Sequence, residues 1–268
     1  AYGECKFPTS EIHVHVKVTF LGTGTSQGVP VIACSCPVCV SLDYRDKRLR
    51  SSVHLQVEGK SIVIDTGPDF RQQMLRERVH QLDAVVFTHA HKDHIAGLDD
   101  VRAYNYLHQK DMPVYGTADV FQQLKKEFYY AFEPVRYPGT PQLQLLEINE
   151  QPFEVADIPF MPLPVKHLHM PVLGFRVGDF SYITDANFIP ENTYARLRGT
   201  RTLVLNALQK EKHVSHFNLE EALVVARKVG AEKTYFIHIS HKLGCHQEIE
   251  QQLPPGVFLA HDGLTLMA

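Results

Sequence analysis

Three histidines and an aspartate lie within six residues of the sequence, between Thr88 and His94. They follow the apolar run 83–87, whose β-branched and aromatic side chains predict a buried strand. The cluster therefore falls where a strand ends and a helix begins, a common position for ligands in layered α/β folds. Imidazoles and a carboxylate this close together are costly unless a cation binds them. We interpret the cluster as a metal site rather than a polar surface loop, with the ligands His89, His91, Asp93 and His94.

Further candidate ligands follow other apolar segments. The segment 162–169 holds two histidines, and either His167 or His169 could bind a metal or lie on a surface strand. The segment 180–185 ends in Asp185, a carboxylate of the kind that bridges two metals. Seven ligands exceed the needs of one tetrahedral ion, whereas two ions that share a carboxylate use them all. We expect these seven to converge at one edge of a sheet sandwich: His89, His91, Asp93, His94, His167, Asp185 and His238.

Such a ligand set predicts hydrolysis. Two ions about 3.5–4 Å apart lower the pKa of a bridging water and hold it as hydroxide at neutral pH. The same ions polarise an acyl or a phosphoryl oxygen, so the reaction class is hydrolysis of an ester or a related bond.

A second constellation is the loop Cys34, Cys36 and Cys39. Three thiolates in one short loop are the usual start of a tetrahedral zinc site, and the fourth ligand would be His241 or Cys245. The alternatives are three buried thiols or a redox pair at Cys36 and Cys39. Five cysteines, three of them clustered, do not suggest a disulfide framework, so we expect a reducing, cytoplasmic setting.

The elements that must position these residues alternate between strands and helices. Strands are predicted at 16–21, 53–57, 61–64, 83–87, 113–116, 203–208 and 234–241, with further strands between 143 and 184. Helices are predicted at 70–78, 98–107, 119–132 and 219–229, the last with Asn218 as its N-cap. The glycine-rich turn 22–28 lacks the third glycine and the immediate helix of a dinucleotide loop, so we expect a structural turn near the site.

Composition restricts the partners. The chain has 268 residues and a formal net charge of −3, so there is no overall positive charge to bind a long nucleic acid. No apolar run approaches the roughly 20 residues of a membrane span. No repeat or linker divides the chain, so we expect an N-terminal extension over 1–15 and one hydrolase domain over 16–268. The expected partner is a small molecule, and a homodimer stays open.

The ligand pattern resembles the metallo-β-lactamase superfamily. The similarity covers almost the whole chain from Val16 and implies an α/β (α+β) fold, an αβ/βα four-layer sandwich of two mixed sheets with outer helices. The resemblance implies that His89, His91 and His167 hold one ion. It implies that Asp93, His94 and His238 hold the other, with Asp185 bridging. Asp65 would accept hydrogen bonds that orient the ligating imidazoles.

A narrower resemblance rests on the turn 22–30, the cysteine loop and the segment His238 to His241. Together they resemble the phosphoribosyl cyclic phosphodiesterases of bacterial phosphonate breakdown. That resemblance implies that His241 completes a structural zinc site, and that His216, just before a helix, is a candidate general acid. His216 could otherwise be a surface residue at a helix entry. Asp93 and His216 are the catalytic candidates.

The leading hypothesis is a metal-dependent phosphodiesterase that cleaves a small phosphate ester, cyclic esters included, through a metal-bridging hydroxide. Its cofactors would be two catalytic divalent ions, zinc or manganese, and one structural zinc. The alternatives are an acyl, thioester or lactam hydrolase, a nuclease that processes tRNA 3′ ends, and a metal-bound scaffold without catalysis. The full ligand set disfavours the scaffold.

Overall fold

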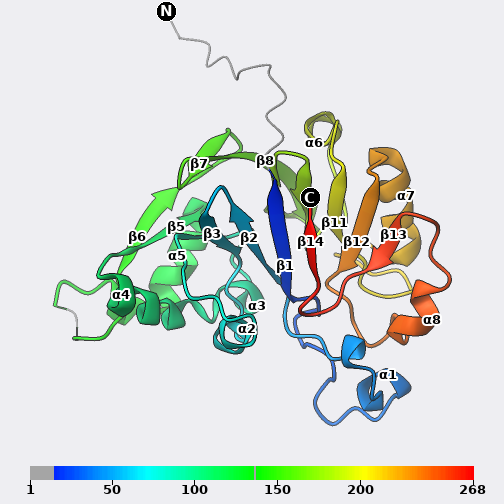
Figure 1. The fold of residues 1–268 in the computed structure, drawn as a ribbon, viewed down its shortest axis with the longest axis horizontal. Helices are drawn as coiled ribbons and strands as arrows, with labels where there is room; N and C mark the ends of the chain where they lie inside the picture. Colours follow the sequence, from blue (N-terminus) through cyan, green and yellow to red (C-terminus); the bar gives the residue numbers. More distant parts are fainter. Residues whose placement is uncertain (1–14, 136) are drawn as a thin grey trace, which may run out of the picture.

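The computed structural model describes residues 15–135 and 137–268, which form two mixed β-sheets with helices on their outer faces (Figure 1). Apart from His15, the predicted N-terminal extension lies outside the described residues. The order of the first sheet is β14-β1-β2-β3-β4-β5-β6, and that of the second is β13-β12-β11-β10-β9-β8-β7. The strands of the first sheet are β1 Val16–Gly22, β2 Ser52–Val57, β3 Lys60–Ile64, β4 Ala84–Val86, β5 Met112–Gly116, β6 Leu143–Glu147 and β14 Thr265–Met267. Those of the second are β7 Phe153–Val155, β8 Ile158–His167, β9 Met170–Val177, β10 Phe180–Tyr182, β11 Thr202–Asn206, β12 Lys233–Ile237 and β13 Val257–Leu259.

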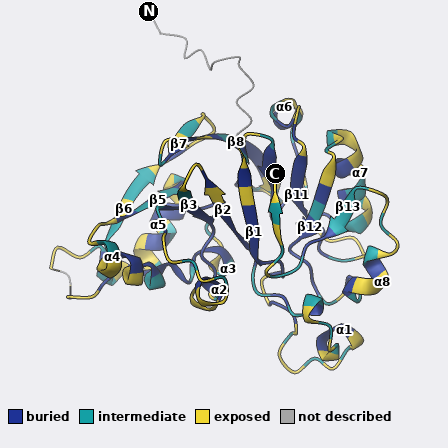
Figure 2. Cartoon of the chain, in the orientation of Figure 1, coloured by how far each residue is buried: buried dark blue, intermediate teal, exposed yellow. Residues whose placement is uncertain are grey.

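Three hydrophobic clusters separate the layers. The first lies between the two sheets and joins residues such as Phe20 of β1 to Phe175 of β9. The second packs the first sheet against α2, η2, α4 and α5, and the third packs the second sheet against α7 and α8. Helices thus cover both outer faces of the sandwich, and Figure 2 shows exposed residues on helices such as α4 and α8. This is the predicted four-layer αβ/βα arrangement.

The sequence of β4 is apolar throughout because both faces of this strand are buried. Ala84 and Val86 face the cluster between the sheets, whereas Val85 faces the cluster under the helices. All three are fully buried, because side chains alternate between the two faces of a strand and both faces are covered.

The helices are shorter than the sequence pattern predicts. The predicted helix 98–107 is a 3-10 turn followed by α4, the helix 119–132 ends at Glu127, and the helix 70–78 ends at Arg76. Near the last of these, Arg78 adopts a left-handed conformation (φ 51°) that no helix continues. The helices are α1 Pro37–Val40, α2 Phe70–Arg76, α3 Lys92–Ile95, α4 Arg102–His108, α5 Ala118–Glu127, α6 Glu191–Arg196, α7 Leu219–Val229 and α8 His246–Glu250. The 3-10 helices are η1 Tyr44–Asp46, η2 Leu98–Val101 and η3 Tyr129–Ala131.

The parallel strands decide where the site forms. Strands β3, β4 and β5 run parallel in the first sheet, and β10, β11 and β12 run parallel in the second. The carboxyl ends of parallel strands meet at one edge, which is where α/β folds place their ligands. Among the residues that the structure describes, no helix is both long enough and apolar enough to cross a membrane.

Candidate metal centres

Asp185, which follows β10, lies at the centre of the site and is 2% exposed. Its Oδ1 lies 3.4 Å from His94 Nε2 and 3.1 Å from His238 Nδ1. Its Oδ2 lies 3.8 Å from His89 Nε2 and 3.2 Å from His216 Nε2. One buried carboxylate therefore faces four imidazoles that come from both sheets and from the segment before α7.

Three groups of potential metal ligands share Asp185. Within each group, one ligand atom of each residue lies within 4.8 Å of the others. A carboxylate common to several groups is the arrangement expected of a bridging ligand between two ions. The groups are Asp93, His94, Asp185 and His238; His89, His91 and Asp185; and His167, Asp185 and His216.

The hydrogen bonds of three histidines fix their tautomers. Thr88 Oγ1 donates to Asp65 and so accepts the Nδ1–H of His89 at 3.0 Å. His94 Nδ1–H donates to Asp65 Oδ2 at 2.7 Å, and His167 Nδ1–H donates to the Ser215 carbonyl at 2.8 Å. When neutral, each ring therefore presents the lone pair of Nε2, which is how a ligating imidazole is held.

Asp65 follows β3 and is fully buried. Besides the His94 ring, its carboxylate accepts the backbone N–H of Thr88 at 2.9 Å and the Thr88 hydroxyl at 2.8 Å. Burial raises the pKa of Asp65, and the His94 and Thr88 contacts oppose that shift. Asp65 thus contacts His94 directly and His89 through Thr88, which agrees with the orienting role that the superfamily resemblance implies.

The donor set fits a bound cation. His89 Nε2, His94 Nε2 and His238 Nδ1 are buried and make no hydrogen bond within residues 15–135 and 137–268. Buried nitrogens without partners are rare, and all three face Asp185. Imidazole and carboxylate ligands suit divalent ions such as zinc, so these residues match the group that their geometry implies.

Electrostatics also favours a cation. Burial lowers the pKa of His89 well below its ordinary value and that of His238 to about 4, so these rings are neutral. Burial would also lower the pKa of His94, but Asp185, Asp65 and Asp93 outweigh it and raise that pKa well above normal. Burial raises the pKa of Asp185, yet His238 and His94 hold it well below its usual range. Metal binding needs neutral imidazoles and ionised carboxylates, which are the states of His89, His238 and Asp185, and a bound cation would replace the proton on His94.

Three of these residues have unusual backbone conformations. Asp65, Asp185 and His238 adopt left-handed conformations with φ of 65°, 53° and 55°. Each directly follows a strand or lies shortly after one. The predicted strand 234–241 therefore ends earlier than expected, at Ile237, and the strand in the segment 180–185 ends at Tyr182. Such conformations cost free energy in residues other than glycine and cluster at functional sites. Here they turn the chain away from the sheet where the ligand side chains must face the centre.

Close backbone contacts hold the cluster 89–94 in place. A Cβ on Gly67 would lie 2.1 Å from the carbonyl oxygen of Asp93, and one on Gly97 would lie 2.1 Å from that of Gly67. Only glycine fits at either position. The loop after β3 therefore packs directly against the backbone of α3, which carries Asp93 and His94.

The structure distinguishes His167 from His169. His167 ends β8 and its ring lies 5.1 Å from that of His91 and 4.4 Å from that of His216, measured between centroids. His169 lies in the turn before β9, is exposed, and belongs to none of the ligand groups among the described residues. His91 is exposed as well, so it lies at the solvent side of the site.

The cysteine loop forms a second cluster. His241 Nδ1 lies 3.3 Å from the sulfurs of Cys34 and Cys36 and 3.5 Å from that of Cys39. The four ligand atoms lie within 4.8 Å of one another, which suits tetrahedral zinc. Cys245 packs beside this cluster but is outside the four-ligand group. Of the two candidates for the fourth ligand, the structure places His241 there.

The thiols of this loop differ in acidity. The backbone N–H of Cys39 lowers the pKa of Cys36 to about 6, whereas burial raises the pKa of Cys39 to about 11. Val31 N–H donates to the Cys39 sulfur at 3.4 Å, a bond that favours the thiolate. The four cysteines of the described residues form no disulfide.

The turn 22–28 lies against the site, as predicted. Thr25 N–H donates to the carbonyl of Ile239 at 3.1 Å, and Thr25 Oγ1 lies 3.4 Å from His238 Nε2. The turn thus packs against the segment between His238 and His241, which joins the two metal clusters.

Sequence reasoning missed residues that hold the ligands without binding a metal. Asn206, the last residue of β11, accepts the backbone N–H of Ala186 at 2.8 Å and donates to its carbonyl at 2.9 Å. This pair of bonds fixes the chain next to Asp185. A buried asparagine at the end of an apolar strand was the available signal.

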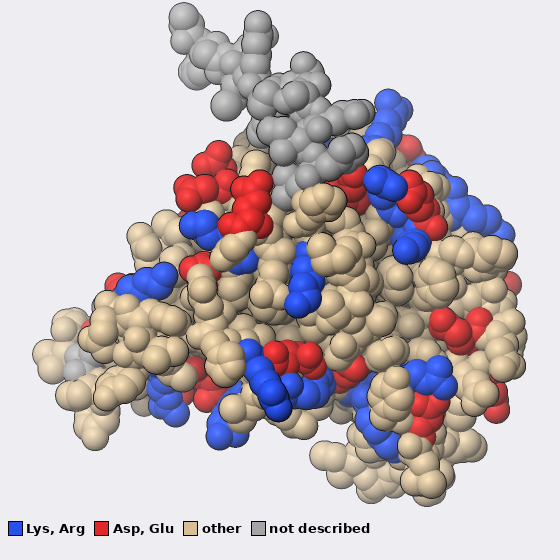
Figure 3. Space-filling view, viewed as in Figure 1, with Lys and Arg blue, Asp and Glu red and all other residues tan. Residues whose placement is uncertain are grey.

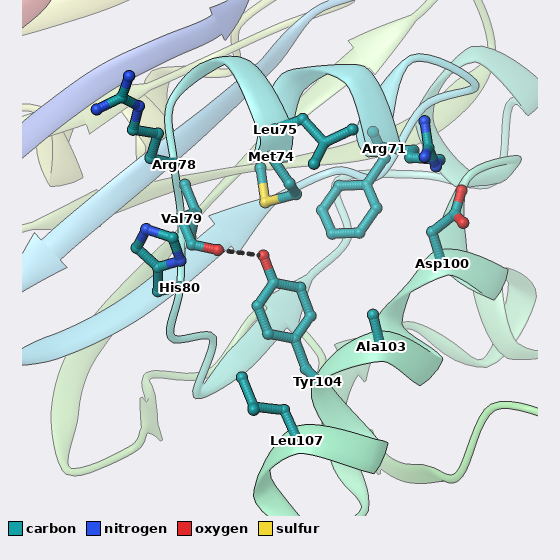
Figure 4. Close-up of a pocket in the computed structure, with 11 residues that line it drawn as sticks. Arg71, Met74, Leu75, Arg78, Val79, His80, Asp100, Ala103, Tyr104 and Leu107 are labelled. Carbon is teal, nitrogen blue, oxygen red and sulfur yellow. Dashed lines mark hydrogen bonds between the residues drawn. The ribbon is translucent and has the colours of Figure 1, made fainter.

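A hollow of about 370 Å³ lies elsewhere, between α2 and α4 (Figure 4). Its lining is mostly apolar, and Tyr104 donates a hydrogen bond to the Val79 carbonyl at 2.7 Å. None of the candidate metal ligands lines this hollow, so it is not the catalytic site.

Comparison with known proteins defines the class. The family described as the β-lactamase superfamily domain matches residues 60–239. A solved structure of a new diphosphatase from the PhnP family is 42% identical, with a TM-score of 0.89 over 95% of this chain and 97% of that one. The chain therefore belongs to the β-lactamase superfamily and, within it, to the PhnP family.

Other relatives show how widely this domain is used. An octanoyltransferase of Porphyromonas gingivalis is 38% identical over 252 residues, which cover 93% of this chain and 51% of that protein. A ribonuclease Z of Prochlorococcus marinus (strain MIT 9515) is 26% identical over 71% of this chain and 61% of that protein. The chain thus spans about half to three fifths of these two relatives. The zinc-bound PqqB structure from Methylobacterium extorquens shares the fold, with a TM-score of 0.74, 19% identity, and coverage of 93% of this chain and 99% of that one.

Proposed function

We propose that this protein is a phosphodiesterase that hydrolyses a small phosphate ester, cyclic esters included, with two divalent ions that would share Asp185 as a ligand. The observation that carries the proposal is the buried Asp185 carboxylate shared by groups of histidine and aspartate ligands. The similarity to a structure named as a diphosphatase of the PhnP family supports phosphorus rather than carbon as the centre of attack.

Each ion would have its own ligands besides Asp185. His89, His91 and His167 would hold one ion, and Asp93, His94 and His238 would hold the other. Zinc and manganese both suit imidazole and carboxylate ligands. When bound, such a pair supplies an activated water and neutralises the charge that develops on a phosphoryl group.

His216 would protonate the leaving oxygen. Its Nε2 lies 3.2 Å from Asp185 Oδ2, so a proton on that nitrogen lies at the edge of the metal site. The residue is 9% exposed, which keeps bulk water away from the transferred proton. A positioned imidazole commonly contributes about 10²–10⁴-fold as a general acid.

The cysteine cluster would hold a structural zinc. Cys34, Cys36, Cys39 and His241 leave no ligand position open, as in closed zinc sites. Reduced thiols in this arrangement support a reducing compartment, the cytoplasm. Replacing Cys36 with serine should remove one zinc per chain and lower the melting temperature, while Cys245→Ser should change neither. Equal zinc content in Cys36→Ser and wild type would contradict this assignment.

The substrate would be small. Lys and Arg alternate with Asp and Glu over the face in Figure 3, rather than forming one basic surface for a long nucleic acid. His216 and both ligand groups lie around one carboxylate, Asp185. A substrate with a single phosphate group is therefore large enough to contact all of them. A small-molecule partner therefore suits the site better than RNA.

The test is a substrate panel with the metal-loaded protein. Bis(4-nitrophenyl) phosphate and a five-membered cyclic phosphate should be hydrolysed, and a chelated sample of the same protein is the control. We expect kcat/KM for the phosphodiesters to exceed that for an octanoyl thioester by at least about 100-fold, or about 3 kcal/mol of transition-state stabilisation.

The second candidate is a thioester hydrolase. The octanoyltransferase relative handles an acyl group by its name, and a metal pair polarises carbonyl oxygens too. Hydrolysis of the thioester without any hydrolysis of phosphodiesters would favour this second candidate and contradict the first.

A further inference from the structure

His213 lies beside the proposed general acid. The two residues belong to the segment that connects β11 to α7, and their Nδ1 atoms are 3.2 Å apart. Their ring centroids are 5.1 Å apart. Since two nitrogens at this distance repel unless one carries a hydrogen, one ring must donate to the other.

The direction of this hydrogen bond follows from a third group. The backbone N–H of Ser215 points at His213 Nδ1 from 3.4 Å, and a backbone N–H only donates. His213 Nδ1 is therefore an acceptor, and the hydrogen between the rings belongs to His216 Nδ1. Burial, His216 and Lys242 all lower the pKa of His213, which agrees with a neutral acceptor.

We infer that His213 is a positioning residue: it accepts the Nδ1–H of His216 and holds that ring with Nε2 at the metal site. The inference rests on the proposed function, in which Nε2 delivers a proton to the leaving oxygen. A group that accepts from the far nitrogen of an acid–base histidine fixes both its orientation and its tautomer, the role that a carboxylate has in serine hydrolases. Here a second imidazole has that role.

The backbone that follows His216 is held by hydrogen bonds, so only the orientation of the His216 side chain has still to be fixed. Phe217 N–H donates to the Ala186 carbonyl at 2.8 Å, next to Asp185. Asn218 begins α7 with a capping box closed by Glu221. Because the chain on the C-terminal side of His216 is held this firmly, the ring's torsion depends on its side-chain contacts: Asp185 at Nε2, and His213 and Ser215 at Nδ1.

Ser215 offers a competing contact. Its hydroxyl lies 3.1 Å from His216 Nδ1 and 3.4 Å from His213 Nδ1, so it can bind either ring. A hydroxyl is a rotating group that both donates and accepts, whereas His213 Nδ1 only accepts when the ring hydrogen is on Nε2. Ser215→Ala is therefore the matched control for His213→Ala.

The experiment compares leaving groups. Metal-loaded wild type, His213→Ala, His213→Asn and Ser215→Ala would be assayed on methyl phosphodiesters that release 4-nitrophenol, phenol or an alkyl alcohol. An acid matters most where the leaving oxygen is most basic. For His213→Ala we expect kcat to fall about 10- to 100-fold with the alkyl leaving group and less than about 3-fold with 4-nitrophenol, at similar KM.

The His213→Asn variant distinguishes a positioning role of His213 from a purely structural one. The amide oxygen that His213→Asn introduces can accept a hydrogen bond from the same side, so this variant should recover most of the alkyl-ester activity. Ser215→Ala should lose less than about 5-fold. Metal content and melting temperature should match wild type in every variant.

The outcomes are distinct. An equal loss over all leaving groups, or no loss at all, would overturn the role of His213 while leaving the phosphodiesterase intact. Wild-type protein that hydrolyses none of the diesters would overturn the proposed function, and the role of His213 with it.

Discussion

Asp185 is the residue on which both candidate ion sites depend, because its two oxygens face nitrogens from both sheets. In the absence of a bridging ligand, two cations at short distance repel each other strongly. The buried Asp185 carboxylate therefore contributes more to the binding of the two ions than any one histidine does.

Replacing Asp185 with alanine should lower kcat/KM for a phosphodiester by more than about 100-fold, because the shared ligand is lost. The zinc of the cysteine loop should stay, since none of its ligands contacts Asp185. Kinetics together with metal analysis check both points. Asp157→Ala, at an exposed carboxylate, is the control. Unchanged turnover in Asp185→Ala would refute the bridging role.

His54 couples stability to pH without touching the metal site. It is buried in β2, where its Nε2–H donates to Ser61 Oγ at 2.7 Å, and burial lowers its pKa to about 4. The unfolded chain, with an ordinary histidine pKa near 6.5, takes up this proton first as the pH falls. The contribution of the neutral ring is thus complete above about pH 6.5 and is lost progressively toward pH 4.

The His54→Gln variant, which keeps a donor for Ser61, should therefore show a weaker fall in unfolding free energy between pH 6.5 and 4. The difference is at most about 3 kcal/mol. Urea unfolding at pH 7 and pH 4.5 measures it. Parallel pH curves for the two proteins would show that His54 does not carry this effect.

At the scale of elements, the strands were predictable and the ends of several were not. The apolar run at β4 and the alternation of apolar and polar residues in β1 predict strands, because apolar residue types mark the positions that are buried. The left-handed conformations of Asp65, Asp185 and His238 are not predictable in this way, since aspartate and histidine adopt positive φ more often than most residues but still only rarely. Tertiary contacts at the site impose it.

Helix α7 is the element whose start was predictable from sequence. Asn218 accepts the N–H of Glu221 at 2.9 Å, and the Glu221 carboxylate accepts the N–H of Asn218 at 3.1 Å. Asn218→Ala should cost about 1 kcal/mol of unfolding free energy, the usual value of an N-cap. Denaturant unfolding measures it, with exposed Val224→Ala as the control. A loss no larger than that of the control would contradict the role of the cap.

At the scale of the molecule, the two sheets bring together ligands far apart in sequence. His89 follows a strand of the first sheet, whereas Asp185 and His238 follow strands of the second. The local motif 89–94 could be recognised from residue types alone, and its convergence with Asp185 and His238 was predicted from their positions after apolar strands. The assignment of each ligand to one of two ions followed from the superfamily resemblance. The contact between His213 and His216 was not predictable, because it depends on how one connecting segment folds.

The two-ion site is tested most directly by a crystal structure of the metal-loaded protein with anomalous scattering recorded at the zinc and manganese edges. We predict two ions about 3.5–4 Å apart, on either side of Asp185, and a third zinc among Cys34, Cys36, Cys39 and His241. A single catalytic ion, or a pair that Asp185 does not bridge, would contradict the central claim.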